Sequence, residues 1–209
     1  MTFMEVFSLV VNSYRDLQAG QTLTGTGTRW VVDNVFENRG FKAYNIRKDG
    51  GWHALVFRGT DGARDWLYNN IQNALGNTRP PQYVSGEYIT SHFGAGKILV
   101  GHSLGGGIAT FASAFHGVPA VTLFPAPVIP SSLPDNGARA DVVNYVCHGE
   151  VLTELSSSGR TGNFWRDSVQ DIIDDALSDH QHRRLGDDFW VQSNAGDPLS
   201  KHFPENIVL

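Results

Sequence analysis

The chain has 209 residues, of which 41% are hydrophobic and 18% are charged, with a net charge of −5 and one cysteine. This composition is that of an ordinary globular domain, and it excludes disordered, collagen-like and coiled-coil proteins. A single cysteine excludes an internal disulfide, and the lack of a basic cluster argues against nucleic acid as a partner. No apolar run approaches the ~18 residues that a membrane span needs, so we expect no stable membrane insertion.

The first elements are predicted from the spacing of apolar residues. Between Met4 and Tyr14 this spacing predicts an amphipathic helix. A signal peptide is not expected there, because Glu5 precedes the apolar stretch and neither a basic segment nor a small-residue cleavage site is present. The protein is therefore expected in the cytoplasm, or exported without a cleaved signal. Residues 29–37 and 41–47 then predict two strands, which are candidates for an antiparallel pair.

The remainder of the chain alternates between strand-like and helical segments. Apolar runs predict strands over residues 52–57, 97–100, 118–124 and 141–147, and helical spacing predicts helices over 61–73, 83–93, 105–115 and 164–177. The tail is expected to be irregular. Strands that alternate with helices favour a single α/β domain over residues 1–209, with a mostly parallel central sheet and helices on both faces.

Residues 101–105, Gly-His-Ser-Leu-Gly, directly follow a predicted strand and open a predicted helix. This G-x-S-x-G pattern is typical of a nucleophile elbow, a sharp turn that presents a serine at the edge of the sheet. The two glycines avoid collisions that β-carbons would cause, and the helix N-terminus favours developing negative charge. The alternative is a glycine-rich turn that only connects two elements. The flanking strand and helix favour Ser103 as a nucleophile.

A serine nucleophile needs a base and an orienting acid, which follow such an elbow in the order acid, then histidine. Glu150 follows the predicted strand 141–147, and His202 lies in a C-terminal loop. We therefore predict Glu150 as the acid and His202 as the base. His102 and His148 are assigned supporting positions around this site. The weaker alternatives for an acid or a base are Asp141, Asp167, Asp197, His180 and His182.

An oxyanion formed during acyl transfer needs hydrogen-bond donors placed in advance. The backbone N–H of Leu104, directly after the serine, is one predicted donor. Thr60 lies just beyond the predicted strand 52–57 and could offer both its N–H and its hydroxyl. For Thr60 taken alone, an ordinary strand-end turn is the alternative interpretation.

Six short segments resemble, in the same order along the chain, the class 3 (fungal-type) lipase family of α/β-hydrolases. They are residues 56–60, 64–67, 101–106, 124–127, 143–150 and 201–203. The resemblance implies an α/β-hydrolase fold with Ser103 as nucleophile, His202 as base and Glu150 as acid. It also implies that Thr60 and Leu104 form the oxyanion hole and that Asn69 holds the threonine side chain.

Two departures from the family pattern bear on the type of enzyme. The acid position usually carries aspartate, and glutamate is one methylene longer. The chain is also short, its single cysteine excludes an internal disulfide, and no signal peptide is expected in it. A bacterial or phage-type relative fits these features better than a secreted fungal enzyme.

The segment 61–82 is a candidate lid over the site, although an apolar helical stripe is more often ordinary core packing. Trp66 in this segment, together with Pro125, Val128 and Ile129 after a strand end, is predicted to contact substrate. We expect a monomeric serine carboxylic-ester hydrolase, a lipase or esterase, that forms an acyl-enzyme with an ester or lipid substrate. No cofactor and no metal are expected.

Three other functions remain open from the sequence. The first is a phospholipase or another lipid-attacking hydrolase. The second is a catalytically silent hydrolase-fold module that binds a partner or a small ligand. The third is a thioesterase that acts on acyl carriers or peptides with the same machinery.

Overall fold

The computed structural model describes residues 1–25, 28–60, 79–150, 152–153, 184–196 and 198–208. Within these residues, eight strands form one sheet in which their order follows the chain. The strands are β1 (Thr22–Gly25), β2 (Thr28–Asn38), β3 (Phe41–Lys48), β4 (His53–Phe57), β5 (Ile98–His102), β6 (Ala120–Leu123), β7 (Val142–Val146) and β8 (Asp187–Trp190). Neighbours from β1 to β4 pair antiparallel, and neighbours from β4 to β8 pair parallel.

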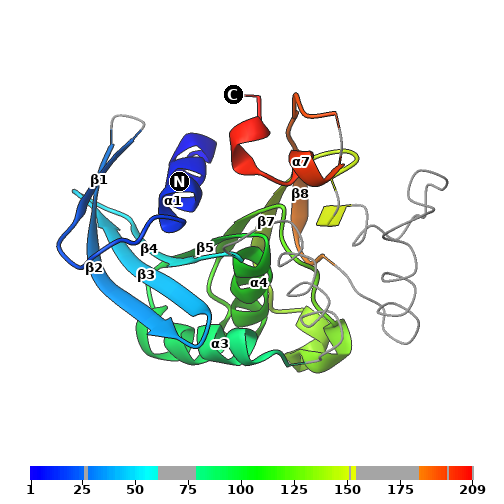
Figure 1. Cartoon of the computed structure of the whole chain (residues 1–209). Helices are drawn as coiled ribbons and strands as arrows, with labels where there is room; N and C mark the ends of the chain where they lie inside the picture. The colour runs from blue at the N-terminus through cyan, green and yellow to red at the C-terminus, as the bar shows by residue number, and fades with distance from the viewer. Residues whose placement is uncertain (26–27, 61–78, 151, 154–183, 197, 209) are drawn as a thin grey trace.

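Helices cover both faces of this sheet (Figure 1). The described helices are α1 (Phe3–Ser13), α3 (Pro81–Phe93), α4 (Leu104–His116) and α7 (Pro198–Lys201), with short 3-10 helices at Pro130–Ser132, Pro134–Gly137 and Pro204–Asn206. Helix α1 and the C-terminal segment lie on one face, and α3 and α4 lie on the other. None of the helices in the described ranges is long and apolar enough to span a bilayer.

Strand β4 shows why the sheet has a core on each side. Ala54 and Val56 belong to the buried cluster under α1, whereas Leu55 and Phe57 belong to the cluster under α3 and α4. Successive side chains of a strand point to opposite faces, so a continuous apolar run fills both cores. This explains why β4 is apolar in every residue after His53 rather than alternating.

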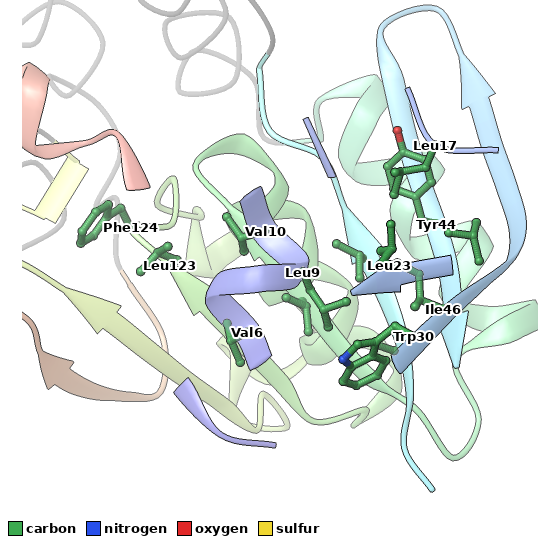
Figure 2. Close-up of a cluster of buried hydrophobic side chains, with 14 of the residues drawn as sticks. Val6, Leu9, Val10, Leu17, Leu23, Trp30, Tyr44, Ile46, Leu123 and Phe124 are labelled. Carbon is green, nitrogen blue, oxygen red and sulfur yellow. The ribbon is translucent and has the colours of Figure 1, made fainter. Parts of the chain in front are cut away.

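Helix α1 is fixed at its start and along one face. The hydroxyl of Thr2 accepts the N–H of Glu5, and the Glu5 carboxylate accepts the N–H of Thr2, which forms a capping box. Val6, Leu9 and Val10 then point into the buried cluster on the strands (Figure 2). The helix therefore holds its C-terminal end in a defined place on the sheet.

The structure confirms the α/β-hydrolase architecture and most of the predicted elements. Two predictions need correction. The antiparallel part extends over four strands. A four-residue strand without a sequence signal, β1, precedes the predicted pair, and β4 also pairs antiparallel with β3. The tail is not irregular throughout, because Asp187–Trp190 forms β8. All four residues of β8 are exposed, so this edge strand lacks the apolar pattern that would have predicted it.

The predicted helices 61–73 and 164–177 lie outside the described residues, as does the candidate lid up to residue 78. The single-domain organisation stays a prediction.

Candidate active site

Ser103 occupies the turn between β5 and α4, with a backbone φ of 57° and ψ of −127°. Such a conformation is sparsely populated for a residue with a side chain and is typical of a nucleophile elbow. A β-carbon at Gly101 would collide with the Gly105 carbonyl, and one at Gly105 would collide with the Phe57 carbonyl. The two glycines therefore allow α4 to start directly against the end of β4.

The Ser103 backbone is anchored on both sides of this turn. Its N–H donates to the Leu123 carbonyl at 3.1 Å, and its carbonyl accepts the Ala126 N–H at 2.9 Å. The Ser103 hydroxyl, in contrast, has no hydrogen-bond partner among the described residues, although it is buried and the whole residue is only 1% exposed. An unpaired buried hydroxyl costs about 1–3 kcal/mol, so its retention calls for a functional reason.

His202 and Glu150 form a buried pair, with relative exposures of 1% and 0%. The His202 Nδ1 lies 2.7 Å from Glu150 Oε1. Because an ionised carboxylate only accepts hydrogen bonds, Nδ1 carries the proton, and Nε2 of the neutral ring is left with its lone pair. This Nε2 is buried and has no partner in the part of the chain that the structure describes. The orientation is the one that a general base requires.

Glu150 also caps the chain that follows it. Its Oε1 accepts the Leu152 N–H at 2.9 Å, and its Oε2 accepts the N–H and the hydroxyl of Thr153, each at 2.7 Å. The Glu150 N–H in turn donates to the Cys147 carbonyl at 3.2 Å. The turn after β7 and these local donors accommodate the extra methylene of glutamate. Leu152 and Thr153 were missed in the sequence analysis, although Thr153 lies at the spacing typical of such a cap.

His102, the residue before the nucleophile, links two distant segments. Its Nε2 lies 2.9 Å from the His202 carbonyl, and its Nδ1 lies 2.6 Å from the Tyr14 hydroxyl. Burial, followed by the nearby His202, lowers the pKa of His102 well below its usual value, so the ring is neutral. Burial also raises the pKa of Tyr14. In the sequence Tyr14 was only a residue of the first helix, and no local pattern connects it with His102.

The aromatic ring of Phe124 contacts this histidine pair. Phe124 follows β6 with a φ of 45°, and its ring centroid lies 6.2 Å from those of His102 and His202. The ring is fully buried at one end of the cluster that Figure 2 shows. Phe124 was not among the predicted site residues, and it shields the two imidazoles from water on that side.

The predicted oxyanion residues both lie next to the elbow. Leu104 is buried and is the first residue of α4. The hydroxyl of Thr60 is buried and lacks a hydrogen-bond partner among the described residues. A β-carbon added at Gly59 would lie 3.3 Å from the Ser103 β-carbon, so the segment that carries Thr60 passes directly beside the nucleophile. The oxyanion role of both residues stays a prediction.

Pro125, Val128 and Ile129 are all buried. Pro125 packs against α4, where a β-carbon at Gly106 would lie 2.9 Å from its Cα. Val128 belongs to the cluster under α3 and α4. These side chains thus follow the strand that neighbours the nucleophile, as predicted, and their contact with substrate stays a prediction.

The remaining predicted residues lie at the margin of the site or outside the described chain. The exposed ring of His148 stacks on Trp190 of β8, with centroids 3.7 Å apart and an interplanar angle of 8°. Asp141 directly precedes β7, at the end of the strand opposite to the end of β5 that carries Ser103. The residues outside the described ranges are Trp66, Asn69, Asp167, His180, His182 and Asp197. The described residues contain no group of three or more metal-ligating side chains, and the absence of a metal stays a prediction.

The sheet, which is parallel from β4 to β8, and the strained turn that carries Ser103 are those of an α/β-hydrolase fold. Residues 10–181, or 172 of the 209 residues, match the Tle-like phospholipase domain family, and the chain belongs to this family.

The chain is also similar to known proteins, in sequence or in fold. The chain is 37% identical over 86 residues to extracellular phospholipase A1 from Serratia liquefaciens. This match covers 40% of this chain and 26% of that protein. The structure is similar to that of M37 lipase, with a TM-score of 0.56 and 10% identity over 93% of this chain and 86% of that one. It is also similar to the Rhizomucor miehei lipase in its propeptide complex, with a TM-score of 0.55 and 12% identity over 93% of this chain and 70% of that one. The resemblance to fungal-type lipases is thus confirmed for the fold.

Proposed function

We propose that this chain is a serine hydrolase that cleaves the carboxylic ester of a lipid, with a glycerophospholipid acyl ester as its preferred substrate. The observation that carries the proposal is the buried Glu150–His202 pair, which leaves His202 Nε2 unpaired. The Ser103 hydroxyl is also unpaired among the described residues, and Ser103 directly follows His102, whose ring centroid lies 4.8 Å from that of His202. The Tle-like phospholipase family and the phospholipase A1 relative favour a phospholipid over a soluble ester.

In the first half of the reaction, His202 Nε2 takes the proton of the Ser103 hydroxyl while the serine oxygen attacks the ester carbonyl carbon. The negative charge that develops on the carbonyl oxygen is stabilised by the N–H of Leu104 and by the N–H or hydroxyl of Thr60. Glu150 holds the imidazolium in place. The ester bond then breaks, and the leaving alcohol takes the proton from His202.

In the second half, a water molecule replaces the alcohol. His202 Nε2 takes a proton from this water as its oxygen attacks the acyl carbon, and the bond to Ser103 breaks. The serine oxygen recovers the proton from His202, and the fatty acid is released. Binding of substrate by Trp66, Pro125, Val128 and Ile129, support of the site by Asn69, and a monomeric enzyme are parts of the same proposal.

The test compares the wild-type chain with Ser103→Ala on two substrates, dispersed phosphatidylcholine vesicles and soluble p-nitrophenyl butyrate. We expect wild-type release of fatty acid from the vesicles, and a loss of at least about 10³-fold in Ser103→Ala on both substrates. Retained activity in Ser103→Ala would contradict the mechanism. Turnover confined to the soluble ester would overturn the phospholipid preference, and no turnover of either ester would favour a binding module or a thioesterase.

A further inference from the structure

A continuous chain of hydrogen bonds connects the first helix with the main chain of His202. It runs from the Tyr14 hydroxyl to His102 Nδ1 at 2.6 Å, and from His102 Nε2 to the His202 carbonyl at 2.9 Å. The three groups come from the end of α1, the end of β5 and the turn after α7. None of these groups takes part in the bond-making steps described above.

The direction of each hydrogen bond in this chain is fixed by chemistry. A backbone carbonyl can only accept, so His102 Nε2 must carry a proton. A neutral imidazole has one donor and one acceptor nitrogen, which leaves Nδ1 as the acceptor. The Tyr14 hydroxyl must therefore donate to it. The order of donors is Tyr14, then His102, then the carbonyl of His202, and it exists only while the His102 ring is neutral.

The segment that carries His202 has little regular secondary structure. Helix α7 has only four residues, and a 3-10 turn at Pro204–Asn206 follows it. The His102 bond ties this segment to β5, the strand that ends at the nucleophile. The His102 ring also packs against the His202 ring, with centroids 4.8 Å apart and an angle of 32° between the planes.

We propose that Tyr14 and His102 are positioning residues for His202. The Tyr14 hydroxyl selects the His102 tautomer with the proton on Nε2, and this Nε2–H holds the main-chain carbonyl of His202. This proposal rests on the proposed function, because it assigns His202 as the base. Helix α1 is in turn held by its capping box and its buried face, so the place of the base relative to Ser103 depends on the packing of the N-terminal helix.

The arrangement also protects the site against a second positive charge. During catalysis His202 becomes an imidazolium, and its ring packs against that of His102. A proton on His102 Nδ1 would make two adjacent cations in a buried site, and like charges in contact are strongly unfavourable there. Because Nδ1 accepts the Tyr14 hydroxyl, its lone pair is already engaged.

Two substitutions of the same residue separate the two bonds of His102. His102→Gln keeps a side-chain N–H at about the reach of Nε2, so it can still donate to the His202 carbonyl. His102→Asn is shorter and keeps a polar group only near the position of Nδ1. We expect kcat for p-nitrophenyl butyrate to stay within about 10-fold of wild type in His102→Gln and to fall by about 10²-fold in His102→Asn, with little change in KM, since a misplacement near 1 Å costs about this much.

Tyr14→Phe removes the donor to Nδ1 without changing the ring. We expect a smaller loss in kcat, about 3–10-fold, because the other His102 tautomer would turn a lone pair toward the His202 carbonyl. Nitrogen-15 shifts of the His102 ring report this directly, with Nε2 protonated in the wild type and a mixture of tautomers in Tyr14→Phe. Tyr44→Phe is the matched control, because Tyr44 is a buried tyrosine whose hydroxyl donates to the Arg15 carbonyl at 3.1 Å.

Equal kcat values for His102→Gln and His102→Asn would overturn the proposal, as would a loss in Tyr14→Phe no larger than in Tyr44→Phe. A wild-type His102 protonated on Nδ1 would overturn it as well. Failure of the proposed function can be told apart from failure of this positioning role. In that case the wild-type chain would hydrolyse the ester no faster than Ser103→Ala.

Discussion

Glu150→Gln tests the acid of the site while keeping the shape of the side chain. In the structure the two carboxylate oxygens accept four hydrogen bonds, from His202 Nδ1, the Leu152 N–H, the Thr153 N–H and the Thr153 hydroxyl. An amide has one oxygen and one NH₂ group in place of the two carboxylate oxygens. Two of the four donors would therefore face the NH₂ group, which cannot accept a hydrogen bond. The Thr153 hydroxyl can rotate and accept instead.

In the Glu150→Gln variant, the least costly orientation of the new amide places its NH₂ toward Thr153. One buried N–H then loses its partner, which costs about 1–3 kcal/mol of stability. The neutral amide oxygen still orients His202, but it no longer stabilises the imidazolium. Replacing the acid by its amide in a Ser-His-acid site lowers kcat by up to about 10⁴-fold, and we expect about 10³-fold here because this orientation keeps the His202 tautomer.

The assay is kcat for p-nitrophenyl butyrate, measured together with thermal unfolding. Glu150→Asp is the matched control, since it keeps the charge and shortens the side chain by one methylene. It should retain more activity than Glu150→Gln even if it is equally destabilised. A Glu150→Gln enzyme within about 3-fold of wild type would refute the reasoning and leave Glu150 only as an acceptor for Leu152 and Thr153.

Three further predictions concern stability. Gly105→Ala should lose about 2–3 kcal/mol in denaturant unfolding, because its methyl group would meet the Phe57 carbonyl; Gly51→Ala, with open space around it, should change little. Since the pKa of His102 is lowered by burial, the unfolded chain binds a proton that the folded chain does not. The free energy of unfolding should therefore fall by about 1.4 kcal/mol per pH unit below about pH 6.5, and His102→Gln should remove this slope; an unchanged slope would contradict it. The hydrogen bond from Lys48 lowers the pKa of Glu5, so Glu5→Gln should cost about 1–2 kcal/mol at pH 7, and the difference from wild type should shrink as the pH falls through the range where Glu5 is protonated.

The elbow could be predicted from the sequence because its determinants are local. Gly101 and Gly105 flank Ser103 at a fixed spacing, and the structure shows that backbone atoms occupy the places of both missing β-carbons. The pairing of Glu150 with His202 joins residues far apart, yet the order of acid and histidine along the chain was enough to predict it.

The contribution of the first helix could not be predicted. Tyr14 reaches His102 across 88 positions, and only the packing of α1 on the sheet brings the two side chains together. Strand β8 was missed for a related reason. Its residues are exposed, so parallel pairing with β7 rather than an apolar pattern makes it a strand.

The central claim is that Ser103 is a nucleophile activated by His202. A fluorophosphonate probe reacts with a serine that a base has activated, and peptide mass mapping locates the label. The account predicts labelling of the wild-type chain at Ser103, with a rate reduced by at least about 10³-fold in His202→Ala. A label on any other residue, or an equal rate in His202→Ala, would contradict the account.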